Sequence, residues 1–323
     1  MPGKRVFISG MGGELGSRVV ALLEDEPWVG DLAGIDADPP RRRLRAATFH
    51  RVPPAETDRI VQIVADFDPH VLVHVASWEP DARAGTGTAK VLTDHAATSV
   101  LGAAAECKTL QAVVVRSGIE VYGRARGSLT RPDEDTALNP TSEYGRMLDG
   151  IETTARAVGQ RVGVPVTLLR LAPVLGPHVP SPLGRVLRQP VVPFSALADP
   201  PFTVVQDHDA AVAICAAARH RHDGPVNVVA PGSISTFQAI RRGGRIPLPL
   251  LGPEWRLVRA LSWVLGAPIP DHVAELFHRG RLADDSRAKD VLGVTPAVTA
   301  VEVIDRLHAW ESVVRVPPRR QVA

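Results

Sequence analysis

The sequence predicts an α/β fold in which helices cover both faces of a parallel sheet, followed by a smaller, irregular C-terminal lobe. Three observations lead to this prediction. Short apolar runs alternate with helical patterns through the first half of the chain, a glycine-rich turn joins the first run to the first helix, and the pattern becomes irregular after Pro173. Such alternation is typical of βαβ units, and right-handed crossovers then give a doubly wound, Rossmann-type core.

Each strand of this core is predicted from a short apolar run that turn residues bound. The runs place strands at residues 6–9, 32–35, 71–74, 112–116, 166–171 and 225–229. Between them, apolar residues recur at helical spacing, which predicts helices at residues 16–23, 58–66, 91–106, 144–162 and 209–219.

The second half of the chain has a different texture. A proline-rich stretch covers residues 177–201, and a Gly/Pro-rich stretch at residues 243–253 predicts a turn or loop. Helical patterns occupy residues 234–241, 254–265, 271–277 and 298–310, and residues 315–323 are expected to fray. We therefore expect a core at residues 1–175, to which residues 203–231 return, and a second lobe at residues 176–323.

Composition excludes several classes of protein. The 323 residues carry a net charge of +2, which gives no broad electrostatic case for binding nucleic acid or a membrane surface. No apolar run approaches the roughly 18 residues of a membrane span, and we identify no signal peptide. Cys107 and Cys215 lie in alanine-rich segments, which predicts buried thiols in a reducing compartment and a cytoplasmic protein.

The strongest motif is the glycine loop in ISGMGGELG. Gly10, Gly13 and Gly16 follow a predicted strand and open a predicted helix, with Gly12 as a fourth glycine in the loop. Gly10 permits a tight turn, Gly13 lets backbone N–H groups approach a pyrophosphate, and Gly16 lets helix and strand pack closely. The anion then lies at the helix N-terminus, although a plain tight turn is the alternative.

Asp36 ends the second predicted strand, where a carboxylate accepts hydrogen bonds from the adenosine ribose and repels a 2′-phosphate. This favours NAD over NADP, and an ordinary turn acid is the alternative. A basic run follows. Its members are expected to form a solvated charge run, with contact to a 2′-phosphate or to adenine as the alternative: Arg41, Arg42, Arg43 and Arg45.

These residues resemble the extended short-chain dehydrogenase/reductase family, that is, NAD-dependent epimerases and dehydratases such as UDP-glucose 4-epimerase. SGMGGELG resembles its glycine motif, HVAS at residues 74–77 a segment against the cofactor, and RSGIEVYG at residues 116–123 a serine-bearing strand end. EYGRML at residues 143–148 resembles its Tyr-x-x-x-Lys helix, and RLAPVLGP at residues 170–177 the loop after the sixth strand. The chain is most similar to a divergent actinobacterial group of this family.

The resemblance implies an NAD site along the sheet, a nucleotide-sugar between the lobes, and a homodimer formed through the helices at residues 91–106 and 144–162. It implies a cofactor-binding core and a substrate-binding lobe. The cofactor contacts that it implies are Gly10, Gly12, Gly13, Glu14, Leu15, Gly16, Asp36, His74, Ala76, Tyr144 and Pro173.

The implied catalytic set is incomplete. Tyr144 matches the family's acid/base, but Leu148 stands at the lysine position and Gly118 at the Ser/Thr position. Ionising an unaided tyrosine at pH 7 costs about 4 kcal/mol. Glu120 is a candidate base, or else a solvent-facing acid. Ser117 is a candidate hydroxyl, although alternation along the strand points it to the other face.

Two functional hypotheses therefore stand. The first is an NAD-dependent epimerase, dehydratase or dehydrogenase with an atypical site, in which Tyr144 is either the acid/base or a packed helix residue. The second is a non-catalytic NAD-binding sensor or assembly protein. We expect no metal site, because His208, between Asp207 and Asp209, has no further ligands at suitable spacing. We expect His74 to be buried and hydrogen-bonded.

Overall fold

The structure is a computed structural model that describes residues 3–81, 84–252, 254–264 and 267–309. Its centre is a seven-stranded parallel sheet in the order β11-β6-β5-β4-β1-β2-β3. The strands are β1 (Lys4–Ser9), β2 (Val29–Asp36), β3 (Thr48–Arg51), β4 (Val71–His74), β5 (Ala112–Gly118), β6 (Val166–Leu171) and β11 (Gly224–Val228). The strand order reverses between β1 and β4, which creates a crevice at the carboxyl ends of these strands.

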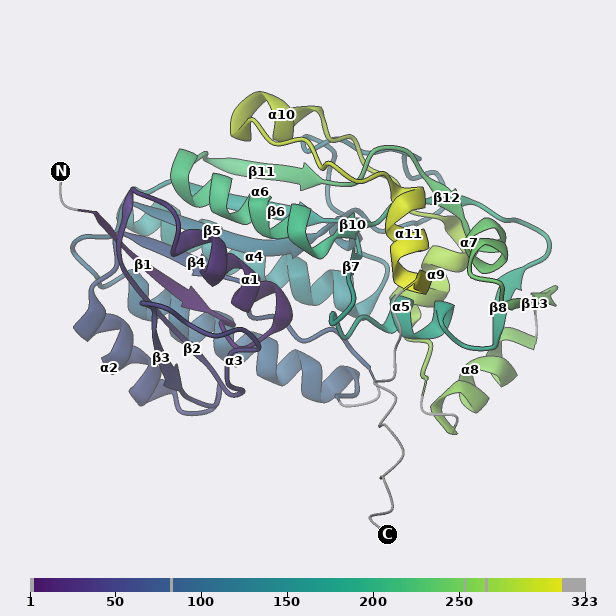
Figure 1. Cartoon of the computed structure of the whole chain (residues 1–323), viewed down its shortest axis with the longest axis horizontal. Coiled ribbons are helices and arrows are strands. Elements are labelled where there is room, and N and C mark those ends of the chain that lie inside the picture. The colour runs from purple at the N-terminus through teal and green to yellow at the C-terminus, as the bar shows by residue number, and fades with distance from the viewer. Residues whose placement is uncertain (1–2, 82–83, 253, 265–266, 310–323) are drawn as a thin grey trace, which may run out of the picture.

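Helices cover both faces of this sheet (Figure 1). On one face α1 (Glu14–Leu23) packs against α6 (Asp207–His220). On the other lie α2 (Thr57–Phe67), α3 (Thr86–Ala104) and α4 (Glu143–Val162), with α3 in contact with both neighbours. The predicted doubly wound α/β class is confirmed. β3, with the polar sequence TFHR, has no apolar run and was not predicted.

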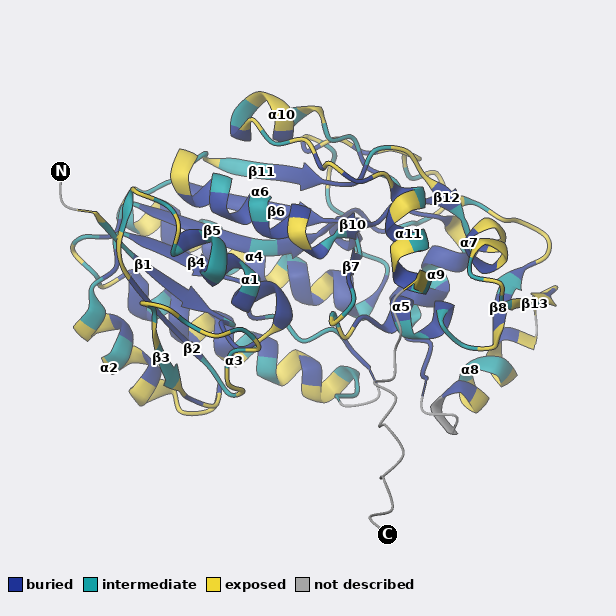
Figure 2. Cartoon of the chain, in the orientation of Figure 1, coloured by how far each residue is buried: buried dark blue, intermediate teal, exposed yellow. Residues whose placement is uncertain are grey.

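The main hydrophobic core lies between the sheet and these helices (Figure 2). Segments from the second half of the chain also contribute to it. Ile214 of α6 and Val226 of β11 belong to this core, as does Leu292 of α10 (Ser286–Leu292). The chain thus crosses into the second lobe, returns to the sheet through α6 and β11, and crosses again.

The second lobe has its own hydrophobic cluster, to which Phe202 and Phe277 contribute. Its helices are α5 (Pro182–Leu187), α7 (Thr236–Arg242), α8 (Glu254–Val264), α9 (Asp271–Arg279) and α11 (Ala300–Ala309). Its short strands are β7 (Val174–Leu175), β8 (Val191–Ser195), β9 (Pro201–Phe202), β10 (Val205–Gln206), β12 (Ile234–Ser235) and β13 (Ile246–Leu250).

One local prediction for this lobe is wrong. Residues 243–253 are not simply a loop, because they contain β13, which pairs in parallel with β8. The predicted frayed tail, residues 315–323, lies outside the described residues. Within the described ranges, no helix has the length and apolar character needed to cross a bilayer.

Candidate functional site

The glycine loop forms a tight cradle at the start of α1. Gly10 has φ +89°, and a Cβ there would lie 2.6 Å from the backbone nitrogen of Ala76. A Cβ on Gly12 would collide with the backbone of Asp38, and one on Gly16 with that of Gly10. These three glycines are therefore required by close backbone packing.

Gly13 differs from its neighbours. Its φ is −65°, and a Cβ there would meet only the Gly10 carbonyl oxygen, at 3.6 Å. Gly13 is the N-cap of α1 and provides no side-chain cap, so the first N–H groups of the helix have no acceptor from it. A bare helix N-terminus facing open space fits a pyrophosphate, because the helix dipole and N–H groups both favour an anion.

Asp36 lies at the edge of this cradle. Its Oδ2 accepts a hydrogen bond from the Gly12 N–H at 3.0 Å, and its Oδ1 accepts one from the Asp38 N–H at 3.1 Å. Burial raises the pKa of Asp36, and these backbone hydrogen bonds oppose the rise. The carboxylate is therefore fixed beside the anion cradle, where an adenosine ribose is expected to lie.

A cavity of about 420 Å³ extends from the cradle along the carboxyl ends of the strands. Its lining begins with the loop and Asp36 and continues to the ends of β4 and β5, where it includes Ala76, Ser77, Glu79 and Arg116. Of the predicted cofactor contacts, the lining contains Gly10, Gly12, Gly13, Glu14, Leu15, Gly16, Asp36 and Ala76.

The basic run divides between surface ion pairs and the cavity. Arg42 pairs with Glu14 at 3.0 Å, and Arg45 pairs with Asp25 at 2.7 Å. Arg41 lines the cavity near Asp36. Two of the four arginines therefore form ion pairs in or next to α1, in line with the expected charge run.

Tyr144 lies in the first turn of α4, whose N-cap Ser142 accepts a hydrogen bond from the Gly145 N–H at 3.1 Å. A Cβ on Gly145 would lie 2.6 Å from the carbonyl oxygen of Glu120, so this glycine allows α4 to approach the 3-10 turn η1 (Ile119–Tyr122) closely. The Tyr144 ring is buried, and its centroid lies 4.9 Å from that of His272.

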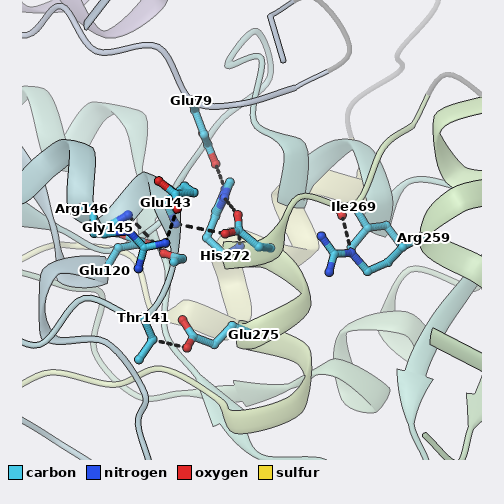
Figure 3. Close-up of polar contacts among 12 residues, drawn as sticks. Glu79, Glu120, Thr141, Glu143, Gly145, Arg146, Arg259, Ile269, His272 and Glu275 are labelled. Carbon is cyan, nitrogen blue, oxygen red and sulfur yellow. Dashed lines mark hydrogen bonds and ion pairs between the residues drawn. The ribbon is translucent and has the colours of Figure 1, made fainter. Parts of the chain in front are cut away.

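His272, on α9 of the second lobe, lies between two carboxylates, and Figure 3 shows its contact with Glu79. Its Nε2 lies 2.9 Å from Glu79 Oε1, and its Nδ1 lies 3.9 Å from Asp271 Oδ1. Burial lowers the pKa of His272, but its contacts with Asp271 and Glu79 outweigh burial and raise the pKa to about 9. Asp271 also accepts a hydrogen bond from the Glu143 N–H at 3.0 Å, which anchors α9 to the start of α4.

Glu120 belongs to a second charged cluster. Its Oε1 lies 3.0 Å from Nη1 of Arg281, whose Nη2 lies 2.6 Å from Glu275 Oε2. Glu120 and Arg281 are both buried, so Glu120 is not a solvent-facing acid. Its carboxylate is instead held in an ion pair with the second lobe.

These surroundings keep Tyr144 protonated. Burial raises its pKa well above the ordinary value, the Arg116 charge opposes the rise, and the carboxylates of Glu79 and Glu120 add to it. A tyrosine in this state donates a hydrogen bond at neutral pH and does not act as a ready base.

The comparisons agree with this geometry. The model of the NAD dependent epimerase/dehydratase family matches residues 6–228, most of the chain. The chain belongs to this family. An uncharacterized protein of Mycobacterium tuberculosis (strain ATCC 25618 / H37Rv) is 31% identical over 317 residues, covering 94% of this chain and 82% of that protein.

Solved structures share the fold. UDP-glucose 4-epimerase from Brucella ovis in complex with NAD is similar with TM-score 0.75 and 17% identity, over 95% of this chain and 97% of that chain. The Thermotoga maritima UDP-glucose 4-epimerase with UDP-glucose has TM-score 0.73 and 16% identity, over 94% and 97%. The family is NAD-dependent, so the predicted cofactor class is confirmed.

The chain departs from the family's catalytic pattern at two positions that lie close together in the structure. Leu148 is 1% exposed, and a Cβ on Gly118 would lie 2.9 Å from its Cδ1 and even closer to Oε2 of Glu120. The volume that a Ser or Thr side chain would take at position 118 is therefore already filled.

Ser117 does not replace that hydroxyl. Its Oγ donates to Glu152 Oε1 at 2.6 Å, about two turns along α4 from Tyr144. Glu152 also binds the Arg170 guanidinium through both carboxylate oxygens, at 2.9 and 2.8 Å. The structure thus corrects the prediction: Ser117 stabilises a buried ion pair in the core.

Three predicted cofactor contacts, His74, Tyr144 and Pro173, are not among the residues that line the cavity. His74 is fully buried, does not line the cavity, and has no hydrogen-bond partner for either ring nitrogen in the part that the structure describes, contrary to the hydrogen-bonded histidine expected. Burial lowers its pKa to about 4, so it is neutral. The Pro173 carbonyl oxygen accepts a hydrogen bond from the Val205 N–H at 3.1 Å, while the adjacent Val174 lines the cavity.

Four residues of the site were missed by sequence reasoning: Glu79, Arg116, His272 and Arg281. Arg116 had a usable signal, because strand alternation places it on the same face as Gly118. The others come from segments without a motif, and His272 and Arg281 reach the site only through packing of the second lobe. Among the described side chains, no cluster of His, Cys, Asp and Glu forms a metal site.

Proposed function

We propose that this protein is an NAD-dependent enzyme of the epimerase/dehydratase type that acts on a nucleotide-sugar. One observation carries the proposal. A single cavity has the Asp36 carboxylate, 3.0 Å from the Gly12 N–H, at one end and Ser77, Glu79 and Arg116 at the other. A long cavity that is built for a pyrophosphate at one end and polar at the other suits a dinucleotide whose reactive ring meets a substrate.

The position of each residue in the cavity suggests its role. The α1 N-terminus and its glycines would hold the pyrophosphate, and Asp36 the adenosine ribose. NAD, when bound, would accept and return a hydride. Tyr144, kept protonated, would donate a hydrogen bond to a substrate oxygen. The Glu120 carboxylate is already held in an ion pair with Arg281, so Glu120 would act on Tyr144 through its charge.

A second candidate, a non-catalytic NAD-binding sensor or assembly protein, is favoured by a specific observation. Leu148 and Glu120 fill the space beside Gly118, so the chain has neither a lysine at position 148 nor a hydroxyl side chain at position 118. The upward shift in the Tyr144 pKa has the same implication.

The deciding experiment has two parts. Calorimetry with NAD first tests the cofactor site, for which we expect binding that Gly13→Ala weakens. Turnover of UDP-glucose and UDP-galactose is then compared among wild type, Tyr144→Phe and Leu148→Lys. Wild-type turnover that falls about a hundredfold or more in Tyr144→Phe supports the enzyme. Binding without turnover, with turnover gained in Leu148→Lys, supports the sensor. Absence of NAD binding refutes both.

We also propose a cytoplasmic homodimer. Cys107 and Cys215 are both free thiols, which is consistent with a reducing compartment. The proposed interface is formed by α3 and α4, which lie side by side, and Val91 on α3 is 53% exposed. Light scattering tests this: Val91→Glu is expected to shift wild-type dimer toward monomer, and a monomeric wild type overturns the proposal.

A further inference from the structure

Arg116 lies in the cavity as a cation without a partner among the residues that the structure describes. It lies near the end of β5, is partly buried, and lines the cavity beside Ser77 and Glu79. Throughout the part of the chain that the structure describes, no hydrogen bond or ion pair links its guanidinium to another residue. A partly buried guanidinium loses hydration, so its missing partner is expected to be a ligand.

The neighbouring acidic residues do not serve as the partner of Arg116, because each is already paired. Glu79 accepts from His272 at 2.9 Å, and Glu120 lies 3.0 Å from Arg281. Asp81, also in the cavity lining, lies 3.1 Å from Arg185. At this end of the cavity the uncompensated charge is therefore positive.

The position of Arg116 separates it from the pyrophosphate cradle. β5 is the second neighbour of β1 in the sheet, so two interstrand spacings, about 10 Å, lie between Arg116 and the strand that leads into the cradle. Arg116 is instead close enough to Tyr144 to oppose the rise in that residue's pKa. Its ligand thus lies at the end where chemistry is expected, not over the helix N-terminus.

We propose that Arg116 binds a carboxylate of the substrate, so that this protein prefers a nucleotide-linked sugar acid to a neutral nucleotide-sugar. The inference rests on the proposed function and specifies its substrate class. A guanidinium matches a carboxylate with two parallel donors, and Glu79, which also lines this end of the cavity, is already paired with His272. The same arrangement therefore gives affinity for a sugar acid and fixes the position of its carboxylate in the cavity.

The test uses two probes that differ at one position. UDP-glucuronic acid carries a carboxylate where UDP-glucose carries a hydroxymethyl group. With NAD present, we expect calorimetry to show UDP-glucuronic acid binding at least about tenfold tighter to the wild type. Arg116→Gln is expected to abolish this preference, Arg116→Lys to keep part of it, and the exposed control Arg43→Gln to keep all of it. Equal binding of the two sugars by wild type, or an unchanged preference in Arg116→Gln, overturns the inference.

Two further measurements distinguish a failure of this inference from a failure of the proposed function. NAD affinity is expected to stay within about threefold of wild type in Arg116→Gln; a loss as large as the loss for the acidic sugar assigns Arg116 to the cofactor phosphates and overturns the proposal. If neither UDP-sugar binds, the nucleotide-sugar part of the proposed function fails. Free glucuronate and free glucose are then compared by thermal unfolding. Only glucuronate is expected to raise the melting temperature of the wild type, and it should not raise that of Arg116→Gln. Equal effects of the two sugars refute the inference.

Discussion

Substituting two glycines of the cradle tests the fold and the cofactor site separately. Gly10→Ala forces a side chain into φ +89° and places its Cβ 2.6 Å from the Ala76 nitrogen. The left-handed conformation costs about 1–2 kcal/mol and the overlap with backbone about 1–3 kcal/mol, so unfolding should become easier by about 2–5 kcal/mol. Gly13→Ala meets only an ordinary 3.6 Å contact at φ −65°, and less than about 1 kcal/mol of stability should be lost.

The effect of Gly13→Ala should appear in cofactor binding. Its methyl group points into the open groove at the α1 N-terminus, where it separates an anion from the N–H donors. Losing one such charge-assisted hydrogen bond costs about 1.5–3 kcal/mol, which is roughly 10- to 150-fold in NAD affinity.

Thermal unfolding without cofactor and calorimetry with NAD measure the two effects. Gly10→Ala should lower the melting temperature by at least about 4 °C, and Gly13→Ala should leave it nearly unchanged while NAD affinity falls. Gly150→Ala is a matched control in α4, with open space at its Cβ. Wild-type NAD affinity in Gly13→Ala would refute the placement of the pyrophosphate, and wild-type stability in Gly10→Ala would refute the packing argument.

Three more predictions concern the buried polar groups. Ser117→Ala should lower the free energy of unfolding by about 1–3 kcal/mol, because Glu152 loses a buried hydrogen bond, with NAD affinity unchanged in calorimetry; reduced affinity at full stability would contradict its structural role. The pKa of His272, raised from 6.5 to about 9, should give stability that is fully present below pH 6.5 and lost as the pH rises through 9, and urea unfolding of Glu79→Gln across this range should show a smaller loss. The pKa of His74, lowered to about 4, acts in the opposite direction: stability should fall as the pH drops from 6.5 toward 4, and His74→Leu should lose less stability over that interval, whereas equal acid sensitivity would count against the neutral, unpaired ring.

The sheet was predictable because each central strand is buried on both faces and therefore appears as a continuous apolar run. The exceptions follow from the same physics. β3, at the sheet edge, is partly exposed and polar. β13 contains Pro247 and Pro249, which remove alternate N–H donors and therefore predict a loop. It pairs with β8 through its remaining groups, and no local pattern encodes that pairing.

The cofactor end of the site was predictable for a different reason. Its geometry depends on backbone conformation, and glycines at fixed spacing encode that conformation directly. The charged end depends on contacts between lobes, such as that of Glu79 with His272, 193 residues apart. Sequence spacing carries no information about such a contact, so only the strand-borne Arg116 left a signal.

Taken singly in the sequence, Leu148 and Gly118 are independent departures from the family pattern, and Glu120 is a separate candidate base. In the structure they are one steric unit. Restoring a hydroxyl with Gly118→Ser alone would drive its Cβ into the Glu120 carboxylate and to 2.9 Å from Leu148, and moving Glu120 would break its ion pair with buried Arg281. A single reversion is therefore expected to lower stability without restoring the family's catalytic set. The side chains of Leu148 and Glu120 thus fill the space beside Gly118, and Arg281 and Glu275 from the second lobe hold this arrangement in place.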